Sequence, residues 1–123
     1  MSFGKSLHVD LYEIDKIICE DINFCYTMLE ALVDLLKMHK QAPPFIFRSP
    51  KEYKDKAGLS GWIPLIESGI SIHTLTQEKF ITIDIYTCGE LHVEDAVNFL
   101  CETLKTHHYE KHTLERGIKY GFK

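Results

Sequence analysis

The segment GISIHTLTQEKFITIDIYTC, residues 69–88, contains two runs in which apolar and polar residues alternate. Such alternation is typical of β-strands that bury only one face, so strands are expected over 69–75 and 80–88. The polar residues TQEK between them predict a turn, which makes the pair an antiparallel hairpin. Burying the isoleucines of both strands on one face sets the register. The expected facing pairs are Ile70 with Ile85 and Ile72 with Ile83.

Hydrophobic periodicity predicts the elements around this hairpin. Apolar spacings of three and four residues indicate two amphipathic helices, one within 20–40 and one over 93–107. Asp21 is the expected N-cap of the first helix, and the two prolines of 41–44 are expected to end it. Pro64 indicates an edge strand or a bulge. Further strands are expected at 6–12, 45–49, 62–67 and about 108–114, with a polar loop over 50–61.

The order of these elements predicts the fold class. A strand and a helix are followed by several strands, a second helix and a last strand. Both helices need an apolar surface to cover, and the sheet supplies it. The expected fold is α+β, a two-layer sandwich in which a mostly antiparallel sheet packs against two main helices. A chain of 123 residues is enough for one domain with one core, residues 1–123.

Composition excludes several classes of protein. The net charge of −4 and the scattered basic residues argue against binding to nucleic acid. The chain lacks an apolar segment near the roughly 20 residues that span a bilayer, and its N-terminus lacks a hydrophobic signal core, so we expect a cytoplasmic protein without membrane contact. The 4 cysteines form no Cys-x-x-Cys pair and are expected to be free thiols. His107, His108 and His112 follow a helix end without acidic or thiol partners, so no metal site is predicted.

The second face of the hairpin is unusually polar. It carries Ser71, His73, Thr82, Asp84, Tyr86 and Cys88. Extending the register places Cys88 opposite Glu67, beside the Glu67–Ser68 peptide bond. Strict alternation puts Ser68 on the opposite face from His73, and a turn or bulge at Ser68–Gly69 would bring the two together. A nucleophile would then meet proton-transfer groups, although such a face is also typical of a solvated sheet surface.

Two motifs carry a resemblance to a known family. ESGISIHT (67–74) followed by IDIYTCGE (83–90) resembles the small prokaryotic S-adenosylmethionine decarboxylases, which are self-processing, pyruvoyl-dependent enzymes. GKSLHVDLYEID near the start resembles the opening strand of that family, KAGLSGW resembles the segment before the cleavage site, and LERG resembles the end of the core. The resemblance covers about residues 4–117.

The resemblance implies a role for each motif residue. Ser68 would attack the carbonyl of Glu67, and elimination and hydrolysis would leave a pyruvoyl group at residue 68. The products would be a β chain of residues 1–67 and an α chain of residues 68–123. His73 and Ser60 would assist processing. Cys88 would assist maturation and then donate a proton after decarboxylation.

The resemblance also implies the cofactor, the product and the assembly. The pyruvoyl group would form a Schiff base with the substrate amine and take the place of pyridoxal phosphate, so neither that cofactor nor a metal is expected. Decarboxylated S-adenosylmethionine would be the aminopropyl donor for polyamine (spermidine) biosynthesis. The family implies a homodimer of processed protomers, with the active site near the subunit contact.

Three departures from the family pattern leave the substrate open. Gly69 replaces a usual histidine, LTQ (75–77) replaces Trp-Pro-Glu, and the loop before Ser60 has no assured match for the aromatic residue that stacks on adenine. Tyr53 is the first candidate for that role and Phe47 the second.

Two alternative functions follow from these departures. A pyruvoyl-dependent ornithine or arginine decarboxylase is one, and Asp10, Glu13 and Asp84 are then candidates to hold a distal cation, although each is equally well read as a solvated carboxylate. An unprocessed, non-catalytic paralogue that binds or regulates a partner is the other. The retained set of Ser60, Ser68, His73 and Cys88 argues against the second alternative.

Overall fold

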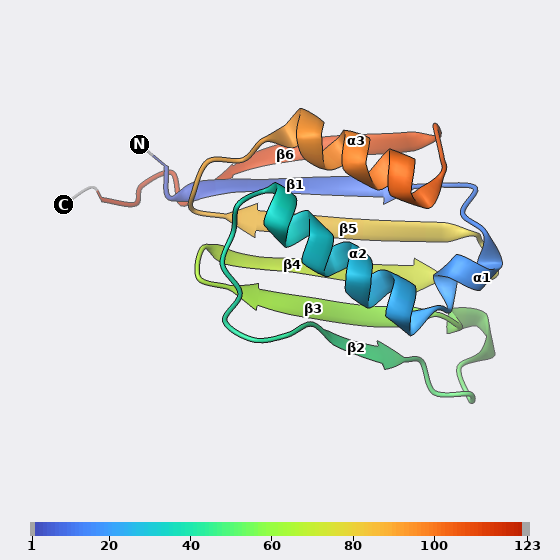
Figure 1. Ribbon diagram of the computed structural model, residues 1–123. Coiled ribbons are helices and arrows are strands. Elements are labelled where there is room, and N and C mark those ends of the chain that lie inside the picture. Colours follow the sequence, from blue (N-terminus) through green and yellow to red (C-terminus); the bar gives the residue numbers. More distant parts are fainter. Residues whose placement is uncertain (1, 122–123) are drawn as a thin grey trace.

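In residues 2–121, the computed structural model shows a six-stranded sheet with helices on one of its faces (Figure 1). The strands are β1 (Gly4–Leu11), β2 (Phe45–Arg48), β3 (Leu59–Leu65), β4 (Ser68–Leu75), β5 (Phe80–Thr87) and β6 (Tyr109–Arg116). The helices are α1 (Lys16–Cys19), α2 (Ile22–Leu35) and α3 (Val93–Leu104), with a 3₁₀ turn η1 at Lys54–Lys56. The predicted α+β two-layer sandwich is confirmed.

The sheet does not follow chain order. Its strands lie in the order β2-β3-β4-β5-β1-β6, and every neighbouring pair is antiparallel. The first strand of the chain therefore lies between β5 and β6, two strands from the second half of the sequence (Figure 1).

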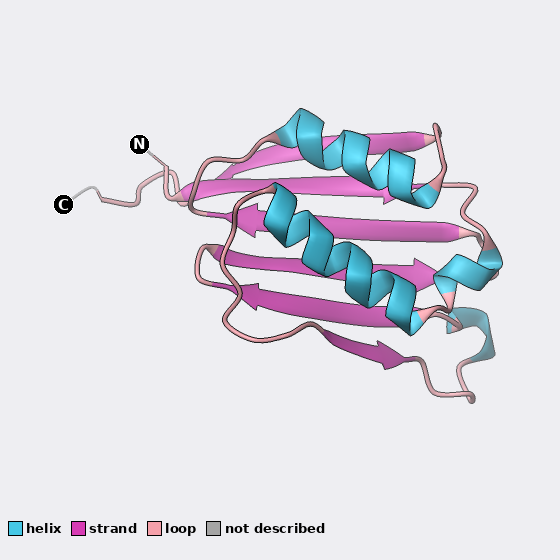
Figure 2. Cartoon of the chain, viewed as in Figure 1, coloured by secondary structure: helices cyan, strands magenta, loops and turns pink. Residues whose placement is uncertain are grey.

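The hairpin of β4 and β5 has the predicted register. Ile70 faces Ile85 and Ile72 faces Ile83. These isoleucines are buried under α2 and α3, which lie on the same side of the sheet (Figure 2). Leucines and valines of β1, α2 and α3 complete one core cluster. The apolar residues that alternate with polar ones in residues 69–88 therefore lie on the face of the sheet that the helices cover.

The helices differ from the prediction in three places, of which one is α3, which ends at Leu104 and not at residue 107. Asp21 caps α2 as expected, because its carboxylate accepts a hydrogen bond of 3.0 Å from the Phe24 N–H. The helix ends at Leu35, well before the prolines, because Lys37 takes up a left-handed conformation with φ 56°. The four-residue α1 is too short to show a helical period and was not predicted. Within residues 2–121, no helix is both long and apolar enough to span a bilayer.

Strand β3 begins earlier than predicted and lies inside the sheet. It starts at Leu59, so Ser60 belongs to a strand and not to the predicted loop. The edge position expected for Pro64 is wrong, since β3 lies between β2 and β4. The Pro64 carbonyl points away from β4, since it accepts a hydrogen bond of 2.9 Å from the Gln41 N–H. The N and O of one strand residue point to the same side, so the N–H that proline lacks would not have bonded to β4. Pro64 is tolerated inside the sheet for this reason.

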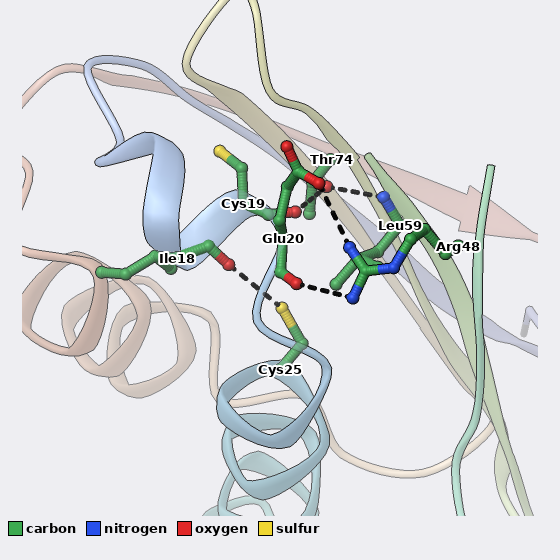
Figure 3. A network of polar contacts seen from close by, with 7 residues as sticks. All are labelled: Ile18, Cys19, Glu20, Cys25, Arg48, Leu59 and Thr74. Atoms are coloured by element: carbon green, nitrogen blue, oxygen red, sulfur yellow. Dashed lines mark hydrogen bonds and ion pairs between the residues drawn. The ribbon is translucent and has the colours of Figure 1, made fainter. Parts of the chain in front are cut away.

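A buried threonine joins α1 to the sheet (Figure 3). The Thr74 hydroxyl accepts from the Leu59 N–H at 2.8 Å and donates to the Cys19 carbonyl at 2.6 Å. Beside it, Arg48 donates to the carboxylate and to the carbonyl oxygen of Glu20, at 3.2 and 3.1 Å. One hydroxyl therefore satisfies two backbone groups that have been removed from water.

We expect Thr74→Val to lower the free energy of unfolding by about 2–3 kcal/mol, because a buried N–H and C=O lose their partner. Thr76→Val is the matched control. Thr76 is 6% exposed and, among residues 2–121, its hydroxyl has no hydrogen-bond partner, so removing that hydroxyl should be neutral or stabilising. Urea denaturation of both variants measures the difference, and equal losses would contradict the assignment.

Candidate functional site

The face of the sheet that the helices leave uncovered is called the open face here. Its polar side chains include those predicted for the hairpin, and three large aromatic residues lie beside them. Phe47, Trp62 and Phe45 are 67%, 51% and 45% exposed. The rings of Phe45 and Trp62 stack with their centroids 6.3 Å apart and 21° between their planes. The open face is therefore polar in its centre and aromatic at the β2–β3 edge.

One row of side chains crosses the open face and is called the His73 row. It consists of Phe47, Ser60, His73, Thr82 and Asp10, which face one another on five adjacent strands. The Ser60 hydroxyl lies 2.9 Å from His73 Nδ1. The Thr82 hydroxyl donates to Asp10 at 2.9 Å. The sheet register thus brings together two of the predicted site residues, Ser60 and His73.

The turn between β3 and β4 holds the predicted cleavage pair. Leu65 pairs with Ser68, which leaves Ile66 and Glu67 as the two residues of the turn. Ser68 has φ 148°, in a region that residues other than glycine rarely adopt. Such a conformation stores about 1–3 kcal/mol of strain. The strain lies directly after the Glu67–Ser68 peptide bond.

The carbonyl of that peptide is held by the neighbouring strand. The Glu67 carbonyl oxygen accepts a hydrogen bond of 2.9 Å from the backbone N–H of Cys88. The predicted placement of Cys88 opposite Glu67 is therefore confirmed. A donor at this oxygen can stabilise negative charge that develops there when a nucleophile attacks the carbonyl carbon.

Glu67 is also held through its side chain. His39 Nδ1 lies 2.6 Å from one carboxylate oxygen, and the His39 N–H donates to the other at 3.0 Å. The hydrogen bond from the His39 ring, followed by the bond from its backbone N–H, lowers the pKa of the Glu67 carboxyl. Sequence reasoning missed His39, because the two residues are far apart in the chain and belong to no shared motif.

Ser68 and His73 are not brought together within one chain. Residues 68–73 pair in continuous register with β3 and residues 68–75 with β5, so the predicted turn or bulge at Ser68–Gly69 is wrong. His73 lies five residues along β4 from Ser68, which at the strand rise corresponds to roughly 16 Å. Ser68 and Cys88 thus lie near one end of the hairpin, and Ser60 and His73 lie toward the other.

Cys88 differs from the other cysteines. Of the four free thiols, Cys88 alone is exposed, just beyond the end of β5. Cys19 and Cys25 are buried, and burial raises the pKa of Cys25 to about 12. Burial also raises the pKa of Cys101. Cys88 is therefore the exposed thiol, and its backbone is hydrogen-bonded to Glu67, the residue before Ser68.

The candidates for substrate binding fall in different places. Tyr53 is 59% exposed and directly precedes η1, whereas Phe47 lies next to Ser60 in the His73 row. Asp10 belongs to the same row. Glu13 lies beyond the end of β1, in the left-handed region with φ 62°. Asp84 lies on the open face, where its carboxylate is 2.8 Å from His8 Nδ1.

Two cavities border these residues. A cavity of about 440 Å³ beside Ser68 is lined by Trp62, Asp84 and Tyr86 among others. A second, also of about 440 Å³, lies over Phe45, Phe47, Ser60 and Trp62. Trp62 contributes to both cavities, and sequence reasoning missed it. Its alternation with Ser60 in β3 is the signal that places it on the open face.

Gly69 makes room for Trp62. A Cβ atom at Gly69 would lie 2.9 Å from Trp62 Nε1, closer than the indole allows without moving. The indole therefore covers the backbone directly after Ser68, in space that a side chain at position 69 would otherwise occupy. This contact gives a physical reason for glycine at that position.

Comparisons with known proteins agree over nearly the whole chain. A model of the protein family described as S-adenosylmethionine decarboxylase matches residues 5–117. S-adenosylmethionine decarboxylase proenzyme 2 of Bacillus anthracis is 33% identical over 118 residues, which cover 95% of this chain and 91% of that protein. The S-adenosylmethionine decarboxylase proenzyme of Thermoplasma acidophilum is 28% identical over 120 residues, which cover 95% of this chain and 87% of that protein.

A solved structure has the same fold. The crystal structure of the adenosylmethionine decarboxylase from Aquifex aeolicus VF5 matches this chain with a TM-score of 0.82 and 25% sequence identity. The match covers 99% of this chain and 97% of that chain.

Proposed function

Because the chain belongs to the S-adenosylmethionine decarboxylase family, we propose that it decarboxylates S-adenosylmethionine with a pyruvoyl group made from its own Ser68. The observation that carries the proposal is the strained Ser68 directly after Glu67, whose carbonyl oxygen already accepts a hydrogen bond from the Cys88 N–H. The relatives named as proenzymes support a precursor that must be processed. The product would serve as an aminopropyl donor for polyamine synthesis.

Self-cleavage starts at the Glu67 carbonyl. The Ser68 hydroxyl oxygen bonds to the carbonyl carbon, the carbon–nitrogen bond breaks, and the nitrogen takes a proton, which converts the amide to an ester. The Cys88 N–H stabilises the negative charge that forms on the carbonyl oxygen. Loss of a proton from the Ser68 Cα and of Glu67 as a carboxylate, then hydrolysis with release of ammonia, leaves a ketone at residue 68.

The surroundings of residue 68 fit a group that must stay fixed after cleavage. Ser68 pairs with Thr87, so the new N-terminus would remain attached to β5. A ketone conjugated to an amide supplies an acceptor for the electron pair that departing CO₂ leaves behind. The exposed Cys88 thiol, close to residue 68, is the group that we propose returns a proton to the substrate carbon.

The separation of Ser68 from His73 supports a site completed by a second copy of the chain. Ser68 lines one cavity together with Trp62 and Asp84 of the open face. If two open faces pack about a two-fold axis that runs across the strands, the His73 end of one sheet lies over the Ser68 end of the other. The partner subunit's His73 and the partner subunit's Ser60 would then assist the cleavage at Ser68. The exposed aromatic residues of the open face are the kind of surface that such a contact covers. The protein would act as a homodimer of processed protomers, each with a β chain 1–67 and an α chain 68–123.

The aromatic cavity supports S-adenosylmethionine as the substrate. Adenine is a flat aromatic base whose face can stack on other rings, and the ring of Phe47 together with the Phe45–Trp62 stack offers a flat aromatic surface beside Ser60. Phe47 replaces Tyr53 as the first candidate for the adenine contact, because it lies in the His73 row. Asp84 in the cavity beside Ser68 favours the second candidate function, decarboxylation of ornithine or arginine, whose distal cation a carboxylate can hold.

Release of labelled CO₂ from S-adenosylmethionine, ornithine and arginine, measured side by side, tests the substrate. We expect the highest kcat/KM with S-adenosylmethionine. Phe47→Ala should raise its KM roughly tenfold through the lost ring contact, while the matched Tyr53→Ala should leave KM near that of the unmodified chain. A preference for either free amino acid would overturn the substrate and leave the cleavage chemistry in place.

A further inference from the structure

We propose that His39 is a positioning residue for self-cleavage, because it holds the carboxylate of Glu67 and thereby fixes the Glu67–Ser68 peptide. The inference rests on the proposed function and names a residue outside the motifs that led to it. His39 belongs to the segment that joins α2 to β2, and Glu67 belongs to the turn between β3 and β4.

The segment around His39 is built onto the cleavage turn. The Ile66 N–H donates to the His39 carbonyl at 2.8 Å, and the Gln41 N–H donates to the Pro64 carbonyl at 2.9 Å. Lys40 forms an isolated bridge to Leu65. Residues 39–41 therefore follow the end of β3 as a short extra strand would, and they bring the His39 side chain against the turn.

Glu67 is consequently held from two directions. Its carbonyl oxygen is fixed by Cys88, and its carboxylate accepts from both the ring and the backbone of His39. Ser68, with φ 148°, follows directly. If the acyl side of the peptide were free to rotate, the turn could relax this strain and move the carbonyl carbon away from the Ser68 hydroxyl. Holding Glu67 at both ends prevents that relaxation.

Fold stability does not account for this contact. The His39 side chain is 75% exposed and that of Glu67 is 21% exposed, and an ion pair with one partner so open to water contributes little to the stability of a fold. The ring hydrogen bond nevertheless lowers the pKa of the Glu67 carboxyl, so the acceptor stays ionised at lower pH than an ordinary glutamate would. The contact therefore fixes geometry at one peptide bond and adds little to the sheet as a whole.

The test is the rate at which newly synthesised chain is cleaved, followed by intact mass after a pulse of translation. We expect His39→Ala to slow cleavage roughly tenfold, since a reacting group displaced by less than 1 Å loses a factor of this order. His39→Asn, which retains a side-chain N–H donor, should restore most of the rate. Lys40→Ala is the matched control in the same segment, where Lys40 pairs with Glu30 away from the turn, and it should cleave at the rate of the unmodified chain.

A double-mutant cycle separates positioning from a general structural effect. Glu67→Gln weakens the acceptor, so adding His39→Ala to Glu67→Gln should slow cleavage little further. Cleavage of His39→Ala at the full rate would overturn the role of His39 and leave the proposed function in place. The same would follow if the rate losses of His39→Ala and Glu67→Gln multiplied in the double variant. An unmodified chain that stays intact would overturn the proposed function and this inference together.

Discussion

Replacing Ser68 with alanine should leave every molecule as one unbroken chain, whereas the unmodified protein should yield two chains, 1–67 and 68–123. Alanine has no hydroxyl oxygen to attack the Glu67 carbonyl, so no ester can form. The strain and the hydrogen bonds at the turn cannot cause cleavage without this nucleophile. The α chain of the unmodified protein should also react with a hydrazide through its terminal ketone, and the variant should not. Intact-mass spectrometry of purified protein measures both effects.

Ser49→Ala is the control for this experiment. Ser49 lies just after β2, outside the residues proposed to act in cleavage, and the variant should be cut as completely as the unmodified chain. An unmodified protein that stays in one piece, even after long incubation, would contradict the enzymatic proposal. The unprocessed, non-catalytic paralogue would then be the better account of the same fold.

Two inactive variants should restore cleavage when they share a dimer. A Ser68→Ala chain keeps His73, and a His73→Ala chain keeps Ser68. If the histidine acts across the subunit contact, the mixed dimer contains one complete site, at which the His73→Ala chain is cut and the Ser68→Ala chain is not. General-base assistance is worth about 10²–10⁴-fold, so the restored cut should stand well above the rate of either variant alone. Co-expression of the two chains with different affinity tags, followed by mass analysis, reports which chain is cleaved.

The control replaces the helper chain with the double variant Ser68→Ala/His73→Ala. This dimer contains no His73, so the His73→Ala chain should remain as slow as it is alone. Equal cleavage with both helpers would show that the restored activity has another source. Failure of the simple mixture, in dimers shown to contain both chains, would mean that His73 acts within its own chain or not at all.

The strand pairing could be predicted from the sequence because one physical rule decides it. Burying the isoleucines of residues 69–88 permits a single register, and that register also placed Cys88 opposite Glu67. The bulge proposed at Ser68–Gly69 was wrong for an informative reason. It assumed that all the site residues must meet within one chain, whereas a regular strand keeps Ser68 and His73 apart.

The contacts that sequence reasoning missed connect segments with no common period. His39 meets Glu67 because the segment after α2 pairs with the end of β3. The early end of α2 at Leu35 depends on the left-handed conformation of Lys37. A lysine rarely adopts this conformation, and no glycine or proline at this position indicates the helix end. Trp62 and Gly69 fit each other across two strands, and neither residue alone indicates the other. Such pairings depend on the finished sheet and not on local preference.

The position of β1 between β5 and β6 determines how a cleaved protein would hold together. A cut after Glu67 separates β1, β2 and β3 from β4, β5 and β6, yet β1 would stay hydrogen-bonded on both sides to strands of the other fragment. Unfolding of a precursor protomer, once separated from its partner, would be an event within one polypeptide. Unfolding of a nicked protomer would release two polypeptides, so its midpoint should depend on protein concentration more steeply than that of the precursor. Cleavage would thus add a second assembly step, between the two fragments of each protomer, that dilution can shift.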